Sequence, residues 1–353
     1  MKISDDTQNR GHGMKALITG ISGRVGANLA QVMKQRGYDI RGLVMPADPQ
    51  APKAAKLGVE IVEADIADAD RVRAAATGVD VIVHLAAQIP QGDSPSERML
   101  DVNTRATMSL LEGALASPAP LQRFVLASTY QAYNPFVTAP VTFDENSPQK
   151  PIDIYALTKL LSEEICFAYM REYGLPVTAL RYCSIKAANE VLGMLHPAWL
   201  NYFIEMTLSN NRIPWFGAEH INETKAIMRE LLETPDAVCA VTDANGLPWR
   251  LVVTDVRDVV AGTILALESD NAVGEAFNMT GAPPISYPEA ARLLADATGR
   301  PYRDVTMPFW RGADASTEKA RAMLGYKPQY TFDKMVETAL AYQRGEPIDQ
   351  VPN

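Results

Sequence analysis

The chain lacks the features that would tie it to a membrane or to nucleic acid. No apolar run in its 353 residues approaches the roughly 18–20 residues of a membrane-spanning helix. The first 13 residues, MKISDDTQNRGHG, are polar and lack the apolar core of a secretion signal. The formal net charge is −9, so the excess of lysine and arginine that binds phosphate backbones is missing. We therefore expect neither a membrane nor nucleic acid as a partner.

Cysteine and histidine are also scarce. The chain has three cysteines and four histidines, and neither type shows the spacing of metal ligands. We expect reduced cysteines, a cytoplasmic location and no metal ion. Internal repeats and low-complexity segments are absent as well, which leaves an acidic globular protein with an ordinary apolar content of 47%.

From residue 15 onward, short apolar runs alternate with segments of helical periodicity. Apolar strands that alternate with helices predict a parallel sheet covered on both faces, the doubly wound, Rossmann-like class of α/β fold. The expected strands are 15–19, 39–44, 59–65, 79–87, 122–128 and 176–182. The expected helices are 25–37, 68–78, 99–117 and 153–174.

This alternation stops after Arg181, where the composition shifts toward aromatic residues and methionine. We expect a disordered tail at 1–13 and a dinucleotide-binding domain at 14–185 and about 251–279. A smaller, discontinuous substrate-binding lobe would take about 186–250 and 280–345. Its large apolar side chains either line a pocket or form its core: Trp199, Tyr202, Phe203, Trp215 and Met228.

Three glycines, Gly20, Gly23 and Gly26, stand between the first strand and the first helix in the run LITGISGRVG. Glycine allows a tight turn and a close approach of the backbone to a pyrophosphate, and the helix N-terminus offers free N–H groups to the anion. Because this turn opens a strand-turn-helix unit, it predicts a dinucleotide site rather than a mere packing turn.

The end of the second strand usually distinguishes NAD from NADP. An acidic residue there binds the adenine ribose of NAD, whereas an arginine accepts the 2′-phosphate of NADP. Here Val44, Met45 and Pro46 offer neither, and Arg24 either reaches a 2′-phosphate or is only solvated. The sequence leaves the choice between NAD and NADP open.

Tyr155 and Lys159 are four residues apart in the run IYALTK. On a helix they would face the same way, and a nearby ammonium would lower the pKa of the phenol and make it a usable proton donor or acceptor. The spacing alone is equally compatible with a pair on the surface.

Several motifs in a fixed order resemble one family, the extended short-chain dehydrogenase/reductases, also called the NAD-dependent epimerase/dehydratase family. The resemblance spans about residues 15–345. It rests on the glycine turn, EADIAD (63–68), HLAA (84–87), DVNTRAT (101–107), FVLASTYQAY (124–133), Y-x-x-x-K (155–159) and LGYKPQYTF (324–332).

The resemblance implies an enzyme that moves a hydride to or from a secondary alcohol. Tyr155 would transfer the proton of the reacting oxygen, Lys159 would hold the nicotinamide ribose, and Thr129 would bond the same oxygen. The implied cofactor contacts are Gly20, Ser22, Gly23, Arg24, Val25, Gly26, Asp65, Ile66, Leu85, Ala86, Ala87, Asn103, Tyr155, Lys159 and Tyr182. The implied substrate contacts are Gln88, Thr129, Tyr130, Tyr155 and Ser184.

The sequence also departs from the family pattern. Tyr130 and Gln131 replace the acidic pair of the dehydratases, which argues against elimination of water. Ser184 replaces an asparagine common in members that bind nucleotide sugars. Arg250 lies near the position of a phosphate-binding arginine, but its spacing to Asp258 is one residue too long, so a salt bridge is an equal alternative.

We predict NAD(P)-dependent hydride transfer on a sugar or sugar-like substrate, by an epimerase-type enzyme or a sugar dehydrogenase. An NADPH-dependent carbonyl reductase is the alternative, and a cofactor-sensing regulator without activity is a remote one. The helices at about 98–117 and 153–173 carry apolar residues on more than one face, which predicts a homodimer through a four-helix interface. The apolar residues are Met99, Leu110, Leu111, Leu115, Leu157, Leu160, Leu161, Ile165 and Phe167.

Overall fold

The structure is a computed structural model that describes residues 11–90, 95–208 and 214–353. Most of the expected disordered tail at 1–13 therefore lies outside the described residues. At its end, Gly13 N–H donates to Gly37 O at 3.2 Å, which joins the chain to the loop before the second strand.

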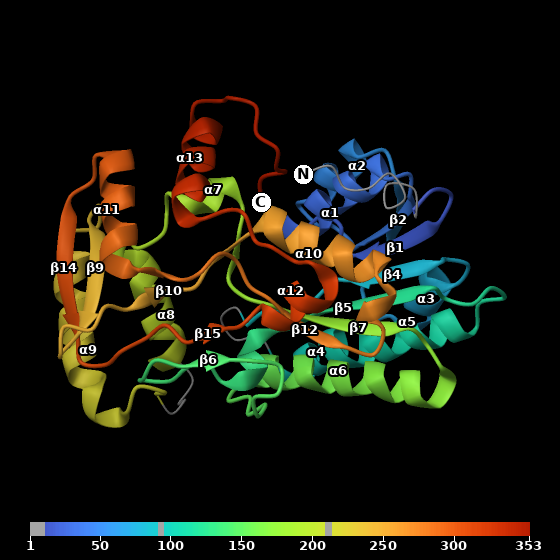
Figure 1. Ribbon diagram of the computed structural model, residues 1–353, viewed down its shortest axis with the longest axis horizontal. Helices are drawn as coiled ribbons and strands as arrows, with labels where there is room; N and C mark the ends of the chain where they lie inside the picture. Colours follow the sequence, from blue (N-terminus) through green and yellow to red (C-terminus); the bar gives the residue numbers. More distant parts are fainter. Residues whose placement is uncertain (1–10, 91–94, 209–213) are drawn as a thin grey trace.

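A seven-stranded sheet forms the centre of the larger part of the molecule (Figure 1), and all of its neighbouring strands are parallel. The strand order is β12-β7-β5-β4-β1-β2-β3, so the order reverses at β1. Such a reversal opens a crevice at the carboxyl ends of the strands, where ligands bind. The strands are β1 (Lys15–Thr19), β2 (Asp39–Val44), β3 (Glu60–Glu63), β4 (Val81–His84), β5 (Arg123–Thr129), β7 (Val177–Tyr182) and β12 (Ala276–Met279).

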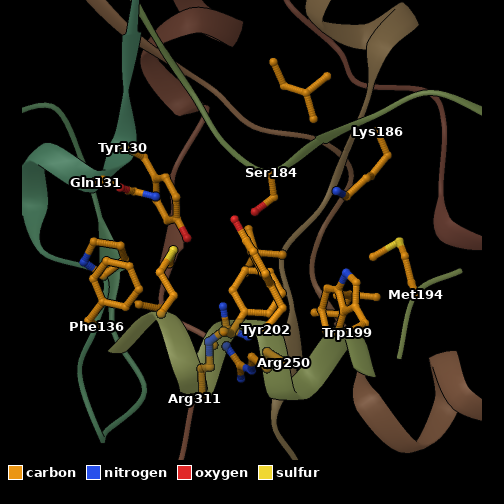
Figure 2. Close-up of a pocket in the computed structure, with 18 of the residues that line it drawn as sticks. Tyr130, Gln131, Phe136, Ser184, Lys186, Met194, Trp199, Tyr202, Arg250 and Arg311 are labelled. Carbon is orange, nitrogen blue, oxygen red and sulfur yellow. The ribbon is translucent and has the colours of Figure 1, made fainter. Parts of the chain in front are cut away.

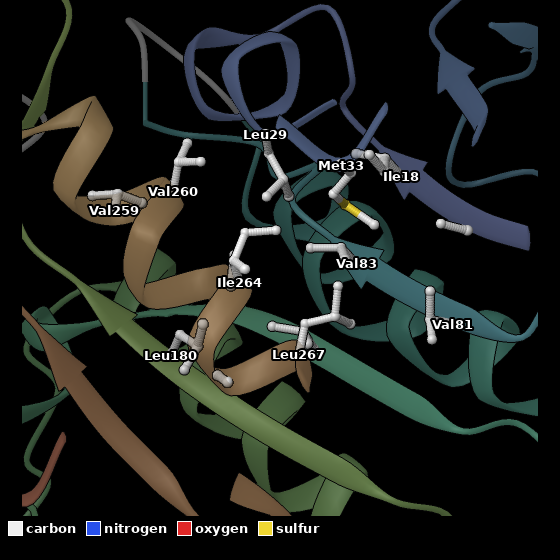
Figure 3. Packing of buried hydrophobic residues seen from close by; sticks show 14 of the residues in the cluster. Ile18, Leu29, Met33, Val81, Val83, Leu180, Val259, Val260, Ile264 and Leu267 are labelled. Carbon is white, nitrogen blue, oxygen red and sulfur yellow. The ribbon is translucent and has the colours of Figure 1, made fainter. Parts of the chain in front are cut away.

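Helices cover both faces of the sheet, as the near-continuous apolar strands predict. On one face, α1 (Arg24–Gln35) and α10 (Val256–Glu268) pack against the strands, with side chains such as Leu29, Ile264 and Val83 in one cluster (Figure 3). On the other face lie α3 (Ala69–Ala76), α5 (Ala106–Leu115) and α6 (Ile154–Tyr173). Two shorter helices, α2 (Ala51–Lys56) and α12 (Glu318–Leu324), add buried side chains to the cluster of α1 and α10, whereas α4 (Ser96–Met99) contacts α6 on the other face.

A second, smaller body lies beside the carboxyl ends of the strands and has its own apolar core. Its centre is a parallel pair of strands, β9 (Val238–Asp243) and β14 (Tyr302–Met307). Its helices are α7 (Ala188–Val191), α8 (Pro197–Leu208), α9 (Ile221–Leu232), α11 (Tyr287–Thr298) and α13 (Phe332–Gln343).

Three short strand pairs join segments that are far apart in the sequence. The pairs are β8 (Ile185–Lys186) with β11 (Thr254–Asp255), β10 (Arg250–Leu251) with β13 (Ile285–Ser286), and β6 (Thr142–Phe143) with β15 (Asp314–Ala315). Single helical turns complete the chain: η3 (Tyr130–Tyr133), η4 (Ala218–His220) and η5 (Asp270–Ala272).

Two predicted elements differ in detail. The expected helix 99–117 begins earlier, at α4, and widens into a π-helical stretch, η2 (Leu100–Arg105), before α5. The expected strand 79–87 ends at His84, because side chains then replace the neighbouring strand as hydrogen-bond partners. Thr19 Oγ1 accepts from the N–H groups of Leu85 and Ala86, each at 3.1 Å.

Candidate active site

The three glycines of the turn after β1 occupy different environments. Gly20 has a φ of +68°, a left-handed conformation that favours glycine. A Cβ on Gly26 would lie 2.2 Å from Gly20 O, so this glycine is required for the helix to pack against the turn. A Cβ on Gly23 would meet only Gly20 O, at 3.4 Å. Gly23 is thus the glycine that leaves open space at the N-terminus of α1, as a bound phosphate requires.

The segment after β4 runs along this turn. Ala86 N lies 3.0 Å from where a Cβ of Gly20 would be, which places the predicted Leu85–Ala87 stretch beside the glycines. Asn103, a predicted cofactor contact, is fully buried instead. Its Oδ1 accepts from Gln88 N at 2.7 Å and its Nδ2 donates to Gln88 O at 3.1 Å. Asn103 therefore fixes the backbone of the groove without facing it.

Two predicted cofactor contacts, Asp65 and Ile66, follow β3. The Asp65 carboxylate accepts from Ala67 N at 3.0 Å and is held bidentately by Arg98 at 2.8 Å. Arg98, which the sequence analysis missed, thus joins this loop to α4. The side chain of Ile66 belongs to the core beneath, together with Val72 and Leu110, so only its backbone is available to a ligand.

Arg24, the candidate for a 2′-phosphate, is engaged within the chain. Its guanidinium forms a bidentate ion pair with Glu190 at the start of the second body. A carboxylate that the sequence analysis missed contacts the glycine turn from the loop after β2: Ser22 Oγ donates to Asp48 Oδ2 at 2.5 Å. Ala47, with a φ of +57°, turns the chain after β2 so that Asp48 returns to the glycine turn.

Thr129 and Tyr155 meet at the carboxyl end of β5. Asp153 caps α6 by accepting from Ala156 N at 2.7 Å, which places Tyr155 in the first turn of the helix. Thr129 forms a side-chain hydrogen bond with Tyr155. Burial, followed by the charge of Asp153, raises the pKa of Tyr155 to about 12. The sequence analysis predicted a lowered pKa, and the structure gives the opposite direction because protein encloses most of the phenol at the edge of the cavity.

Lys159 lies one turn further along α6 and is buried, with 2% of its surface exposed. Among the described residues, no group accepts a hydrogen bond from its Nζ. Burial lowers the pKa of Lys159 to about 8, although the nearby Glu163 opposes this shift. A buried ammonium is normally paired, so an unpartnered one a helical turn from Tyr155 fits a ligand that supplies oxygen acceptors, such as a ribose.

A buried polar network lies behind this group and completes its own hydrogen bonds. Arg181 donates to both oxygens of Glu163, with Nη2 at 2.6 Å from Oε2 and Nε at 3.1 Å from Oε1. Ser128 also donates to Glu163, and Arg181 also donates to Tyr133. Tyr133 in turn donates to Asn278 at 3.0 Å. These contacts fix the ends of β5, β7 and β12 relative to α6.

A cavity of about 360 Å³ opens in front of Tyr155, between the two bodies (Figure 2). Of the predicted substrate contacts, Tyr130, Tyr155 and Ser184 line it, whereas Gln88 and Thr129 do not. Ser184 is exposed at the cavity with a φ of +38°. Further lining residues from the second body include Trp199, Tyr202, Phe203, Arg250 and Arg311.

The remaining candidates lie in the core. Tyr182, a predicted cofactor contact, is buried between β7 and α10, where its hydroxyl bonds Thr263 Oγ1 at 2.7 Å. Val25 and Leu85 pack partly against the same core. Of the large apolar residues predicted for the second body, Trp215 and Met228 belong to its apolar core and do not line this cavity.

Arg250 forms no salt bridge with Asp258, whose carboxylate accepts from Gln329 N at 2.8 Å and Tyr330 N at 3.1 Å.

Two further features of the described residues bear on the excluded classes. None of the helices in that part of the chain is both long and apolar enough to cross a bilayer. Within the same residues, no group of three or more His, Cys, Asp or Glu side chains is arranged to hold a metal ion. All three cysteines are buried free thiols.

The doubly wound sheet, the glycine turn and the Thr129–Tyr155–Lys159 group define a dinucleotide-dependent enzyme of the short-chain dehydrogenase/reductase type. The model of the NAD dependent epimerase/dehydratase family matches residues 16–280. The chain belongs to this family. The predicted fold class, family and enzymatic nature are thereby confirmed.

Individual relatives agree with this assignment. A UDP-glucose 4-epimerase from Corynebacterium glutamicum is 27% identical over 338 residues, covering 93% of this chain and 95% of its own. UDP-glucuronate 4-epimerase 5 from Arabidopsis thaliana is 26% identical over 376 residues, covering 98% of this chain and 79% of its own. A short-chain dehydrogenase/reductase superfamily protein from Agrobacterium tumefaciens, solved with bound NAD, is 28% identical with a TM-score of 0.78, covering 94% of this chain and 97% of its own.

Proposed function

We propose that the chain catalyses NAD-dependent hydride transfer at a secondary alcohol or ketone of a sugar or sugar-like substrate. The observation that carries the proposal is the arrangement at the cavity: the Tyr155 hydroxyl, bonded to Thr129, faces the space in which a substrate fits, with the unpartnered Lys159 ammonium one turn behind. The related 4-epimerases and the NAD-bound structure support the same chemistry.

Each residue then has one task. Thr129 and Tyr155 bond the reacting oxygen, and Tyr155 takes its proton during oxidation and returns it during reduction. Lys159 binds ribose oxygens of the cofactor, and its charge then favours the phenolate of Tyr155, which burial alone disfavours. The nicotinamide supplies the hydride acceptor and donor. Gly23 and the N-terminus of α1 bind the pyrophosphate.

NAD is the cofactor that the charges favour. The guanidinium of Arg24 is already neutralised by Glu190, so it is not free to bind a 2′-phosphate. Asp48, bonded to Ser22 in the glycine turn, places a negative charge where a 2′-phosphate would be repelled. These contacts also argue against the NADPH-dependent carbonyl reductase.

The fate of the cofactor separates an epimerase from a sugar dehydrogenase. An epimerase returns the hydride to the same substrate and keeps its nucleotide, whereas a dehydrogenase releases it after each turnover. Denaturing the purified protein and assaying the released nucleotide distinguishes them. One equivalent of retained NAD supports the epimerase-type enzyme, and an empty protein that reduces added NAD in the presence of sugars supports the dehydrogenase.

The decisive test of the site is Tyr155→Phe. We expect turnover to fall at least ~10²-fold, in line with general acid–base catalysis, while NAD affinity is retained. Tyr173→Phe is the matched control, because this tyrosine lies exposed at the end of the same helix. Near-normal turnover of the Tyr155 variant would remove the catalytic assignment.

We also propose that the chain forms a homodimer through the faces of α5 and α6, and that it works in the cytoplasm. Several apolar side chains on these helices are exposed, Leu157 at 39%, Leu161 at 37% and Met108 at 41%. Met99, Leu110 and Leu111, which the sequence analysis named among the apolar residues of these helices, are buried and do not contribute to this exposed face. Light scattering of wild type and of a Leu157→Glu, Leu161→Glu variant tests the interface. A monomeric wild type at micromolar concentration would contradict it.

A further inference from the structure

The cavity in front of Tyr155 differs in charge from the rest of the molecule. The chain carries 42 acidic against 33 basic side chains, yet the charged residues that line the cavity are four cations and one carboxylate. The cations are Arg24, Lys186, Arg250 and Arg311, and the carboxylate is Asp153. An acidic protein that gathers cations around one cavity indicates a negatively charged ligand.

Three of the four cations form no salt bridge with another described residue, although the charge of Arg250 acts on the buried Asp314. Arg24 is paired with Glu190, but among the described residues Lys186, Arg250 and Arg311 form no salt bridge. Arg311 donates to the hydroxyl of Tyr287 at 3.1 Å and lies 4.7 Å from the ring centroid of Phe203. The set is thus only partly satisfied within the chain.

The neighbouring carboxylates do not neutralise Lys186. Both oxygens of Glu190 are bonded to Arg24, and Oε2 also accepts from Ala187 N at 2.9 Å. Asp153 is occupied as the cap of α6. Burial lowers the pKa of Lys186, with the charge of Glu190 opposing and that of Arg24 adding to the effect. The ammonium therefore lacks the compensation that a half-buried charge normally has.

Lys186 lines the same cavity as Tyr155. Thr129 pairs with Tyr182 in the register of β5 and β7, and Lys186 follows four residues later in β8. Figure 2 shows its side chain directed into the cavity beside Ser184, while Arg250 and Arg311 enter from the second body. A group bound by Lys186 would thus belong to the reacting unit of the substrate itself.

Resting on the hydride transfer proposed above, we infer that the sugar unit that reacts at Tyr155 carries an acidic group, a carboxylate or a phosphate, and that Lys186 binds it. Lys186 is then a specificity-determining residue of the substrate site. Because hydrogen bonds to charged groups are among the stronger ones, we expect an acidic ligand to bind about 10–100-fold more tightly than its neutral analogue, which is about 1.4–2.7 kcal/mol.

The test measures binding and turnover separately, at saturating NAD. The probes are matched acidic and neutral ligands: glucuronate with glucose, gluconate with glucitol, glucose 6-phosphate with glucose, and UDP-glucuronate with UDP-glucose. Binding is measured by calorimetry or by the shift in melting temperature, and turnover by NADH absorbance or by sugar analysis.

The variants are Lys186→Gln, Lys186→Arg as the charge-conserving change, and Lys225→Gln as a control for the loss of one exposed charge on α9.

We expect at least one acidic ligand to bind ten-fold more tightly than its neutral partner. That preference should fall to within about threefold in Lys186→Gln and persist in Lys186→Arg and Lys225→Gln. The first two pairs report a carboxylate and the third a phosphate. Three results would overturn the inference: equal binding within every pair, no detectable binding of any acid, or a preference unchanged in Lys186→Gln. Tight binding of UDP-glucose that is indifferent to Lys186 would assign the cations to a nucleotide diphosphate.

The two proposals fail in different ways. Acid-selective binding that depends on Lys186, without hydride transfer on any ligand, would leave this site standing and remove the proposed function. Turnover of neutral sugars that equals turnover of acids would leave the function standing and remove this inference.

Discussion

Two buried cations, Arg181 and Lys159, lie within one small region but differ in their hydrogen bonding. Arg181, on β7, is enclosed by Glu163 of α6 and Tyr133 of η3, and its donors bond acceptors of the protein. Lys159 stands one helical turn before Glu163, is equally buried, and finds no acceptor among the described residues. The first group stabilises the fold, whereas the second is completed only by a ligand.

The same contrast exists within the glycine turn. Gly26 packs against the chain's own backbone, while Gly23 faces open space at the same helix terminus. A binding site is thus distinguished less by its residue types than by polar groups without a hydrogen-bond partner and by space that the folded chain leaves unfilled.

Arg181→Met breaks the completed network. It leaves the carboxylate of Glu163 buried without its bidentate partner, and removing one member of a buried pair typically costs about 3–5 kcal/mol. We expect a loss of this size in the free energy of unfolding, measured by urea denaturation. Arg71→Met, at an exposed pair with a 3.7 Å separation from Asp68, is the control and should change stability by less than about 1 kcal/mol. Similar losses in both variants would contradict a special role for the network.

Gly26→Val and Gly23→Val divide the glycine turn in two. At Gly26 the new side chain meets Gly20 O at 2.2 Å and Ile21 Cα at 2.6 Å, so we expect a destabilisation of about 3 kcal/mol from overpacking. Gly23→Val should fold normally but lose NAD binding, because its side chain fills the space of the phosphate. Thermal unfolding and calorimetry with NAD check both, and each variant is the control of the other. Unchanged NAD affinity of Gly23→Val would make the turn purely structural.

Lys159→Met should have opposite effects on stability and activity. Lowering a buried lysine's pKa from 10.5 to about 8 corresponds to a cost on the order of 3 kcal/mol at neutral pH. Removing the charge should therefore stabilise the cofactor-free protein by about 2 kcal/mol and abolish turnover. The wild type gains stability between about pH 8 and 10.5, where only its unfolded state still binds this proton.

The advantage of Lys159→Met should thus be largest below about pH 8 and close as the pH rises toward 10.5. Urea denaturation at pH 7 and pH 10 measures it in both proteins. A variant that is less stable than the wild type at pH 7 would show that Lys159 has a partner in the folded chain.

The sheet and the glycine turn were predictable because local patterns determine them. Apolar runs alternating with helical periodicity specify a parallel sheet, and Gly20, Gly23 and Gly26 mark its first turn whatever lies elsewhere in the chain. The spacing of Tyr155 and Lys159 likewise placed both side chains on one helix.

What the sequence did not predict depends on contacts between distant segments. The pKa of Tyr155 follows from burial, which residue spacing does not reveal. Asn103 was assigned to the cofactor, but its amide is used by the backbone of Gln88. Asp48 was missed because it lies beyond the strand end, and only the turn at Ala47 returns it to Ser22. A search for acidic residues a few positions past the second strand would have included it.

Asp48→Asn should give the smallest effect of these variants. It tests whether the carboxylate bonded to Ser22 in the glycine turn favours NAD over NADP. The carboxylate of Asp48 bonds Ser22 Oγ through Oδ2 and Gln50 N through Oδ1, at 2.8 Å for the latter, and an asparagine retains the acceptor for Gln50. The variant should therefore fold normally but lose the charge that repels a 2′-phosphate. We expect the ratio of NAD to NADP affinity, measured by calorimetry, to fall about tenfold, which is about 1.4 kcal/mol.

Asp70→Asn, at an exposed carboxylate on α3, is the matched control and should leave the ratio unchanged. Because Arg24 stays paired with Glu190 in both variants, a change confined to Asp48→Asn separates the carboxylate's contribution from that of the arginine. An unchanged ratio in Asp48→Asn would mean that this carboxylate only shapes the loop after β2.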